Sequence, residues 1–486
     1  MSKFPDTPNF TGFYKPMRFE ADVTDLEMEG ELPADLDGAF FRVAPDPHHP
    51  PKLGDDIFFG GDGAATRFRI KNGKVDMKHR YVRTPKFEME EKAGRALWGA
   101  YRNPLTDDES TKGVRRSTAN TNVVEHAGKL WALKEDSPPV AMDLNTLETE
   151  GMSDFGGKLK SDAFTAHPKI DPKTGQMLAI NYATKGLMTT TMSYVEIAPD
   201  GTLTKEIFFE APYYCMVHDF GITDDFVVFP IMPCVGSWER LEAGLPHFGW
   251  DPSLPLYMGV LRRDDEKGDV RWFKAPAAFF GHVINSWNEG DKVYLDAPVM
   301  EGNGFDFFPA VDGSPFDPSK AVPIPHRFVF DMSSNSDSFE RSPIAPIPGE
   351  LPKVDDRYMG QAYRHAWYGG VDPSKPFEAP YAAADVGLFF MNIVVHQDLA
   401  TGAPQTYWDG PSSIFQETCF VPRTPNSPEG DGFVVVLCNQ IDQNRSDLLF
   451  LDATNIAAGP VARAKLPYWM RAGVHGSWCD GSKLAN

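Results

Sequence analysis

Short runs of β-branched and aromatic residues recur along the whole chain, and each run is bounded by Gly, Pro, Asp or Asn. Such runs are typical of strands that end in tight turns. The clearest are KLWALKE (129–135), QMLAIN (176–181), DFVVFPIM (225–232), KVYLDAPVM (292–300), HRFVFDM (326–332) and GFVVVLCN (432–439). The tripeptides DGT (200–202), EGD (289–291) and DGS (312–314) are typical of hairpin turns. Convincing helical periodicity is scarce, so the pattern predicts an all-β protein.

Chain length narrows the choice among all-β architectures. With 486 residues, the chain is too long for a single small barrel, and the number of strand-like runs favours a β-propeller. A sequence repeat of propeller length is not visible, so this prediction depends on the strand pattern alone. The Pro-rich patches at 45–51 and 342–352 are short and are interpreted as loops. We therefore expect residues 1–486 to form one domain.

Composition and charge limit the partners and the compartment. The formal net charge of −21 repels phosphate backbones, so we expect no nucleic-acid partner. Five cysteines, none in a CxxC pair, fit a reducing compartment without a disulfide framework. The N-terminal segment lacks the apolar centre of a signal peptide, and no apolar run is long enough to span a membrane. The sequence therefore predicts a cytoplasmic protein with no membrane partner.

Histidines carry the strongest hint of chemistry, because P-loop, HExxH, GxSxG and CxxC motifs are all missing. Four of the twelve histidines stand where a strand meets a loop, beside small or apolar residues: His167, His218, His282 and His475. Neutral imidazole is a ligand for iron, zinc or copper, and distant strands can share a site without a short motif. Three glutamates could orient such ligands: Glu135, Glu350 and Glu417. Taken alone, ordinary strand ends explain these residues equally simply.

Two long segments resemble motifs of the carotenoid cleavage oxygenase family. GELPADLDGAFFRVAPDP (30–47) is similar to the opening motif of the family. FFGGDGAATRFRIKNGKVDMKHRYVRTPKF (58–87) resembles its GDG segment and the strand that follows. The contexts of the four histidines and three glutamates then follow in family order, and the match extends from near Glu20 to the C-terminus. Several long motifs in one order make this resemblance specific.

The resemblance implies a seven-bladed β-propeller with loops and short helices capping the active-site face, and with Fe(II) on its axis. His167, His218, His282 and His475 are the implied iron ligands, and Glu135, Glu350 and Glu417 the carboxylates that orient three of them. The sequence ELPKVDDR, which begins at Glu350, departs from the more aromatic family pattern at that position. An all-histidine shell leaves coordination positions open for O₂.

The substrate expectation depends on two further features. The stretch 86–113 is heavily charged where carotenoid-cleaving relatives carry an apolar patch for membrane approach, which favours a water-borne substrate. Lys134 and Tyr101 match the pair that holds the 4-hydroxyl group in the stilbene-cleaving branch of the family, and Phe59 and Phe305 would enclose the aromatic rings. Lys134 directly precedes Glu135, so on a regular strand their side chains would face opposite sides.

The resemblance therefore implies a non-heme Fe(II) dioxygenase that cleaves the central C=C bond of 4-hydroxystilbenes with O₂ to give two aromatic aldehydes. The expected partners are the hydroxystilbene and O₂, with a homodimer as a family-level expectation. Three alternatives stay open: an apocarotenoid-cleaving oxygenase with the same iron, an isomerohydrolase, and a non-catalytic propeller scaffold. A Ca²⁺-dependent propeller hydrolase would need oxygen ligands, whereas the candidate cluster is rich in nitrogen.

Overall fold

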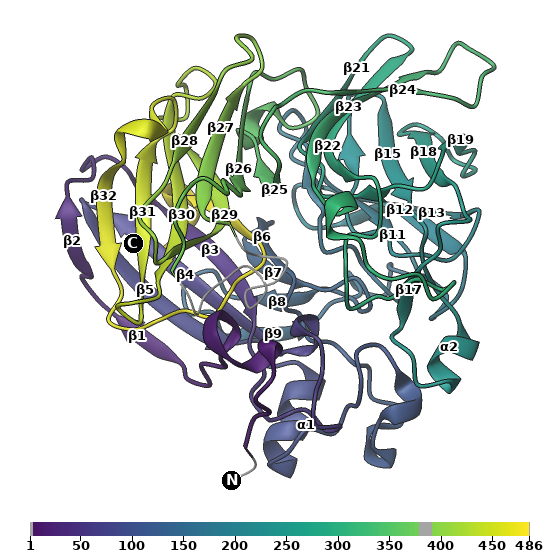
Figure 1. Ribbon diagram of the computed structural model, residues 1–486, viewed down its shortest axis with the longest axis horizontal. Helices are drawn as coiled ribbons and strands as arrows, with labels where there is room; N and C mark the ends of the chain where they lie inside the picture. The colour runs from purple at the N-terminus through teal and green to yellow at the C-terminus, as the bar shows by residue number, and fades with distance from the viewer. Residues whose placement is uncertain (1–2, 379–390, 486) are drawn as a thin grey trace.

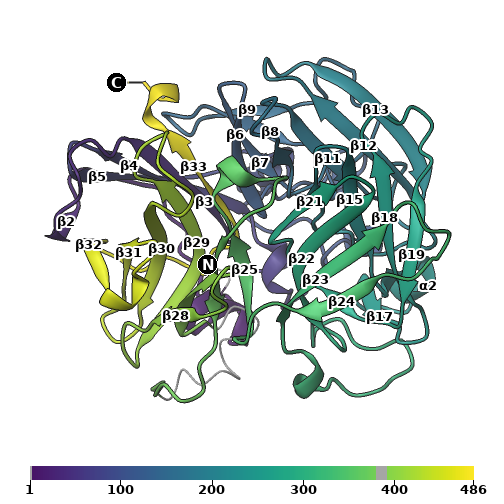
Figure 2. The same cartoon turned by 90° about the horizontal axis from the view of Figure 1, so that it is seen from above.

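The computed structural model describes residues 3–378 and 391–485, and strands dominate it (Figure 1). Seven of its sheets contain four or five strands, and together they form the seven blades of a β-propeller. The predicted all-β propeller is therefore confirmed. Figure 2, which views the molecule from above, shows the sheets arranged around a common centre.

Five blades are built from consecutive stretches of chain. They contain β6 (Asn122–His126), β7 (Lys129–Leu133), β8 (Val140–Met142) and β9 (Thr149–Met152); β10 (Lys169–Ile170), β11 (Met177–Asn181), β12 (Thr191–Ile197) and β13 (Leu203–Glu210); β14 (Gly221–Ile222), β15 (Phe226–Ile231), β18 (Leu256–Arg262) and β19 (Arg271–Ala275); β20 (Phe279–Phe280), β21 (Asn285–Glu289), β22 (Lys292–Met300), β23 (Ile324–Asp331) and β24 (Glu340–Pro343); and β25 (Gly349–Lys353), β26 (His365–Gly370), β27 (Ile393–Asp398) and β28 (Pro404–Tyr407). A separate two-stranded sheet pairs β16 (Cys234–Gly236) with β17 (Phe248–Trp250).

The remaining two blades combine strands from both ends of the chain. One contains β29 (Ser413–Pro422), β30 (Gly432–Gln440), β31 (Arg445–Asp452), β32 (Pro460–Lys465) and the early strand β2 (Glu27–Gly30). The other contains β33 (Gly476–Asp480), β3 (Gly38–Pro45), β4 (Gly63–Lys71), β5 (Lys74–Tyr81) and β1 (Ala21–Val23). Because β33 pairs antiparallel with β3, backbone hydrogen bonds between the chain ends close the ring.

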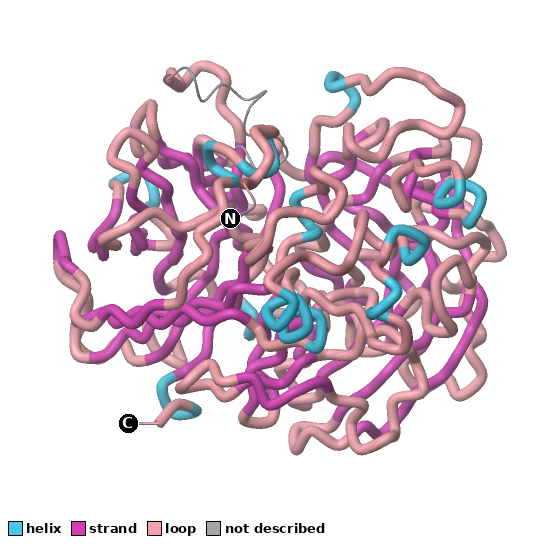
Figure 3. Tube along the Cα trace, turned by 90° about the horizontal axis from the view of Figure 1, so that it is seen from below, coloured by secondary structure: helices cyan, strands magenta, loops and turns pink. Residues whose placement is uncertain are grey.

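Helices are short and lie among loops outside the sheets (Figure 3). The longer of the two α-helices among the described residues, α1 (Pro85–Ala93), begins after Thr84, whose side chain accepts a hydrogen bond from the Phe87 N–H. It ends at Gly94, which has a φ of +66°. The second, α2, covers Trp238–Glu242. Among the described residues, no helix has the length and apolarity that a membrane span requires.

The strand predictions agree with the structure except for one turn. DGT joins β12 to β13 and EGD joins β21 to β22, as the pattern indicated. DGS instead lies inside the long connection 301–323 between β22 and β23, so the prediction of a tight hairpin there was wrong. Turn-forming residues mark a change of direction, but the strands that the turn joins are selected by long-range pairing.

Apolar side chains packed between blades hold the ring together. Trp367 on β26 is fully buried and stacks on Phe420 of the neighbouring blade, with ring centroids 4.7 Å apart. Its indole N–H donates to the Ala453 carbonyl at 2.9 Å. Both contacts bridge two blades, so this side chain ties one sheet to the next.

Substituting Trp367→Ala should lower the free energy of unfolding by about 3–5 kcal/mol, because it leaves a cavity and a buried carbonyl without its donor. Chemical denaturation followed by circular dichroism measures the change. Leu105→Ala is the control, since Leu105 is 56% exposed and its loss should change stability by less than about 0.5 kcal/mol. Equal denaturation midpoints for both variants would contradict this account of blade packing.

Candidate metal centre and adjoining cavity

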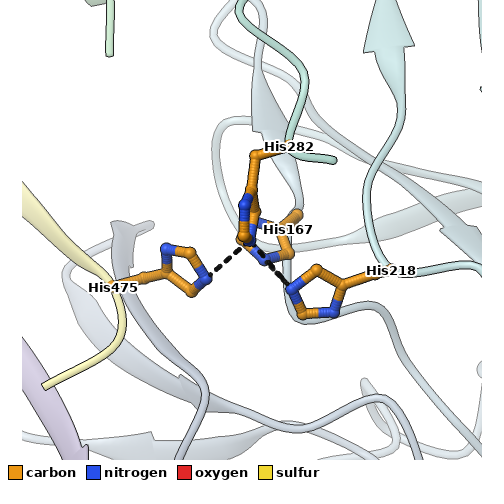
Figure 4. Close-up of side chains that lie close together, drawn as sticks. All are labelled: His167, His218, His282 and His475. Carbon is orange, nitrogen blue, oxygen red and sulfur yellow. Dashed lines mark hydrogen bonds between the residues drawn. The ribbon is translucent and has the colours of Figure 1, made fainter. Parts of the chain in front are cut away.

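Four histidine side chains from different blades point toward one place, as Figure 4 shows. His167, His218 and His475 each lie one to three residues before an edge strand of a sheet, β10, β14 and β33 respectively. His282 lies between β20 and β21. One ligand atom of each residue lies within 4.8 Å of the corresponding atoms of the others. The structure therefore brings together all four histidines that the sequence singled out.

Carboxylates fix the orientation of three of these rings. The Nδ1 atom of His282 lies 2.8 Å from Glu350 Oε2, and that of His475 lies 2.7 Å from Glu417 Oε1. His218 Nδ1 makes a short hydrogen bond to Glu135 Oε1. An ionised carboxylate can only accept, so each Nδ1 must donate its proton. In the neutral form of each of these three rings, the Nε2 atom therefore carries the lone pair.

These lone pairs face each other at close range. His282 Nε2 lies 3.0 Å from His218 Nε2 and 3.1 Å from His475 Nε2. His167 Nε2 approaches His218 Nε2 at 3.1 Å. Two unprotonated nitrogens at this distance repel, whereas a cation between them would attract both. Imidazole nitrogen suits iron, zinc and copper, so the residues present fit a transition-metal ion.

Burial and neighbouring charge affect the proton affinity of the four ligands differently. Burial lowers the pKa of His167 and of His475 well below the usual histidine value, and the other nearby imidazoles lower it further. These two rings are therefore neutral and available as ligands at neutral pH. For His282, burial also acts to lower the pKa, but the charge and hydrogen bond of Glu350 outweigh it and raise the pKa. Protons therefore compete with a metal ion more strongly at His282 than at His167 or His475.

The orienting carboxylates also differ from one another. Burial alone would raise the pKa of Glu135, but His218 and Lys134 outweigh it and hold that pKa well below its usual range. Burial raises the pKa of Glu417, against the opposing charge of Lys353, whose Nζ lies 3.4 Å from Glu417 Oε2. Glu135 is thus held firmly as an anion beside His218.

A largely apolar cavity adjoins the four histidines. Its walls include Phe59, Phe305, Met216 and Met300, and His218 and His282 line it together with Glu135 and Glu350. A molecule in this cavity would thus lie directly beside the histidine cluster. A second, more polar cavity is lined by His167, His282 and His475 and by charged residues such as Lys353 and Asp219.

Lys134 and Tyr101 both line the apolar cavity. The Lys134 Nζ lies 5.2 Å from the centroid of the Tyr101 ring and 3.4 Å from Thr121 Oγ1, to which it donates. Lys134 and Glu135 share this cavity although they are consecutive, because β7 ends at Leu133 and strand alternation stops there. The sequence pattern left the direction of the Lys134 side chain open, and the end of the strand determines it.

Phe59 and Phe305 lie close together in the cavity wall. Their ring centroids are 6.1 Å apart and their planes meet at 79°, an edge-to-face contact. The sequence-based expectation is that the two phenylalanines lie on opposite faces of a substrate ring. In the structure they instead form adjoining walls of the cavity. Sequence reasoning also missed Thr121 and the sulfur-containing residues of the wall, because single threonines and methionines carry no functional pattern.

The family model described as RPE65, retinal pigment epithelial membrane protein, matches residues 14–480. This chain belongs to that family. The family is that of RPE65 and the carotenoid cleavage oxygenases, and it is iron-dependent. The buried four-histidine group of this chain fits that metal.

Similar proteins within the family share nearly the full length of the chain. The lignostilbene-α,β-dioxygenase isozyme III of Sphingomonas paucimobilis is 51% identical, with 100% of this chain and 99% of the relative covered. The isoeugenol monooxygenase of Pseudomonas putida is 42% identical, with coverage of 97% and 98%. The crystal structure of the Pseudomonas brassicacearum lignostilbene dioxygenase superposes with a TM-score of 0.95 at 46% identity, covering 99% of this chain and 100% of that one.

Substituting Glu350→Gln should weaken iron retention about tenfold or more, because the amide keeps the shape of the side chain but loses the charge beside His282. Iron content after dialysis against graded chelator concentrations measures the effect. Glu301→Gln provides the control, since Glu301 is exposed and pairs only at the surface with Arg341. If both variants keep iron as the unmodified protein does, Glu350 does not support the metal centre.

Proposed function

We propose that this chain is a non-heme Fe(II) dioxygenase that cleaves the central C=C bond of 4-hydroxystilbenes with O₂ to give two aromatic aldehydes. One observation carries the proposal: a single apolar cavity contains both the Lys134–Tyr101 pair and two of the clustered histidines. A hydroxystilbene could thus place its phenol at the polar pair and its alkene near the metal. The names of the Sphingomonas and Pseudomonas relatives support this substrate class.

In this proposal His167, His218, His282 and His475 hold the iron, and Glu135, Glu350 and Glu417 keep three of the imidazoles correctly oriented. Bound Fe(II) would supply the site at which O₂ is activated. The reaction inserts both oxygen atoms: the C=C bond breaks, and each carbon becomes the carbonyl carbon of one aldehyde. No external reductant is needed, because both oxygen atoms of O₂ enter the two aldehydes.

Lys134 and Tyr101 would activate the substrate through its phenol. A stilbene alkene reacts poorly with O₂, but a phenolate oxygen in the 4-position donates electron density through the ring to the alkene. Burial lowers the pKa of Lys134, although Glu135 and Asp136 oppose the change. In this proposal the neutral form of Lys134 takes up the phenol proton and remains beside the phenolate as an ammonium ion. The Tyr101 hydroxyl, whose pKa burial raises, stays protonated and donates to the same oxygen.

The apolar walls have two tasks in this proposal. Phe59, Phe305, Met216 and Met300 exclude water, which strengthens the attraction between the ammonium and the phenolate. They also hold the rings of the substrate so that its alkene stays near the histidine cluster.

We further propose that residues 1–486 act as one catalytic propeller in the cytoplasm. The homodimer stays a prediction.

An aerobic assay of Fe(II)-loaded protein with resveratrol tests the proposal directly. Loss of stilbene absorbance, with two aldehydes formed in equal amounts, is the expected result. Isoeugenol, which has a 4-hydroxyphenyl alkene but no second ring, tests whether two rings are required. If iron is shown to be bound and the protein cleaves neither resveratrol nor isoeugenol, the proposal is wrong. An apocarotenal is then the next substrate to assay.

The variant Lys134→Met should reduce kcat/KM for hydroxystilbenes by about 10²-fold or more, because it keeps the bulk of the side chain and removes the proton acceptor. Lys129→Met is a matched control, since Lys129 begins β7, the strand that directly precedes Lys134, and pairs with Glu150 at the surface. Cleavage by Lys134→Ala at the unmodified rate would show that the phenol is activated in some other way.

Replacing the 4-hydroxyl group of the substrate by 4-methoxy should slow cleavage by about 10²-fold, because the ether has no proton to lose and cannot form a phenolate. Steady-state rates with the two compounds give the ratio. The ratio should shrink toward one in Lys134→Met, since that variant no longer discriminates between them. An unchanged ratio in the variant would separate Lys134 from recognition of the hydroxyl group.

A further inference from the structure

A buried ion pair between Arg102 and Asp136 lies next to the phenol-binding residues Tyr101 and Lys134 in the chain. Arg102 follows Tyr101 in the chain, and Asp136 lies two residues after Lys134. Arg102 Nε lies 3.2 Å from Asp136 Oδ2, with 1% of the arginine side chain and 13% of the aspartate side chain exposed. This contact therefore links the segment that carries Tyr101 to the segment that carries Lys134.

Several other contacts hold Arg102 in place. Its Nη1 donates to the Tyr182 hydroxyl at 2.6 Å, and its guanidinium lies 5.3 Å from the Tyr182 ring centroid and 5.5 Å from that of Phe248. The carbonyl oxygen of Arg102 accepts from His247 Nδ1 at 2.9 Å. The φ of Arg102 is +52°, a conformation that costs energy for a residue with a side chain. The surroundings therefore impose a strained backbone directly beside Tyr101.

The Tyr101 ring lies close to two basic side chains. Lys134 Nζ lies 5.2 Å from its centroid, and the guanidinium carbon of Arg102 lies 5.9 Å from it. The Tyr101 backbone N–H also donates to Asp56 Oδ1 at 3.1 Å. Arg102 and Asp136 line a separate cavity from the one that contains Tyr101 and Lys134. Neither residue lines the cavity proposed for the substrate, so any effect of the pair on the substrate is indirect.

Stability alone does not explain this ion pair. Within the described residues, Arg102 Nε and Nη2 and Asp136 Oδ1 are buried without a hydrogen-bond partner, so the Nε–Oδ2 contact is an ion pair without hydrogen-bond geometry. A buried ion pair that leaves polar atoms unsatisfied stabilises a fold less than a well-packed apolar pair would. Its best-supported use elsewhere is to specify one arrangement among several.

We propose that Arg102 and Asp136 are positioning residues that set the separation of Tyr101 and Lys134, and so the geometry in which the substrate phenol is held. This inference rests on the proposed function. Without the pair, the loop that carries Tyr101 and the segment after β7 would lose their direct connection. Recognition of the 4-hydroxyl group would then weaken, while the iron centre and the apolar walls would stay intact.

The test compares Arg102→Gln, Asp136→Asn and the double variant in the full-length iron-loaded protein. Each single change leaves one buried charge unpaired, whereas the double variant removes both charges and keeps the protein testable if a single variant fails to fold. Arg115→Gln is the matched control, since Arg115 forms an exposed ion pair with Asp162. Thermal unfolding and iron content confirm that each variant is folded.

Two readouts separate positioning from a purely structural role. The first is the KM and kcat for a 4-hydroxystilbene. The second is anaerobic binding of the same compound and of its 4-methoxy analogue, where a red shift of the bound hydroxystilbene reports the phenolate. In the double variant we expect the KM to rise about tenfold and the red shift to be lost. Affinity for the methoxy analogue should stay within about twofold.

The outcomes distinguish this inference from the proposed function. If the unmodified protein cleaves hydroxystilbenes and the double variant keeps its KM and red shift, the inference is wrong and the proposed function stands. If the double variant loses both ligands equally, or loses iron, the ion pair is structural and the inference is again wrong. If the iron-loaded unmodified protein neither binds nor cleaves hydroxystilbenes, both proposals fail together.

Discussion

The rest of the structure depends on the mutual repulsion of buried imidazole lone pairs, which the orienting carboxylates turn toward one another. Glu135, Glu350 and Glu417 each accept a hydrogen bond from the Nδ1–H of one histidine, which leaves the Nε2 atoms facing one another about 3 Å apart. Such an arrangement is repulsive until a cation lies among the rings. The protein must hold the rings rigidly, and the closed ring of blades, completed by the pairing of β33 with β3, provides that rigidity.

The same centre separates two environments. On one side the cavity is apolar and has one polar pair, Lys134 and Tyr101, whereas the other cavity is lined by charged residues such as Lys353 and Asp219. A metal ion held by neutral ligands keeps its charge, and the carboxylate behind each of three rings compensates for it without occupying a coordination position. The histidine cluster can therefore adjoin an apolar substrate in one cavity and charged side chains in the other.

Much of the fold could be predicted from short-range patterns. Runs such as 176–181 and 432–439 became β11 and β30, because β-branched and aromatic side chains fit a pleated surface whatever the topology. DGS at 312–314 shows the limit, since it lies inside a long connection and joins no tight hairpin. The side chain of Lys134 shows another, since its direction depends on β7 ending one residue earlier. Likewise, the edge-to-face contact of Phe59 with Phe305 follows from loops that meet only in the folded chain.

Taken by itself, the sequence determined the strand content, the acidic charge and, through family resemblance, which histidines and glutamates to compare. Only the tertiary structure decided that these residues meet. His282 and His475 are 193 positions apart, and no local pattern relates them. Their contact arises because the blades that carry the histidines direct the residues beside an inner strand toward a shared axis. The Arg102–Asp136 ion pair likewise has no sequence signature, because it exists only once two distant segments have been packed side by side.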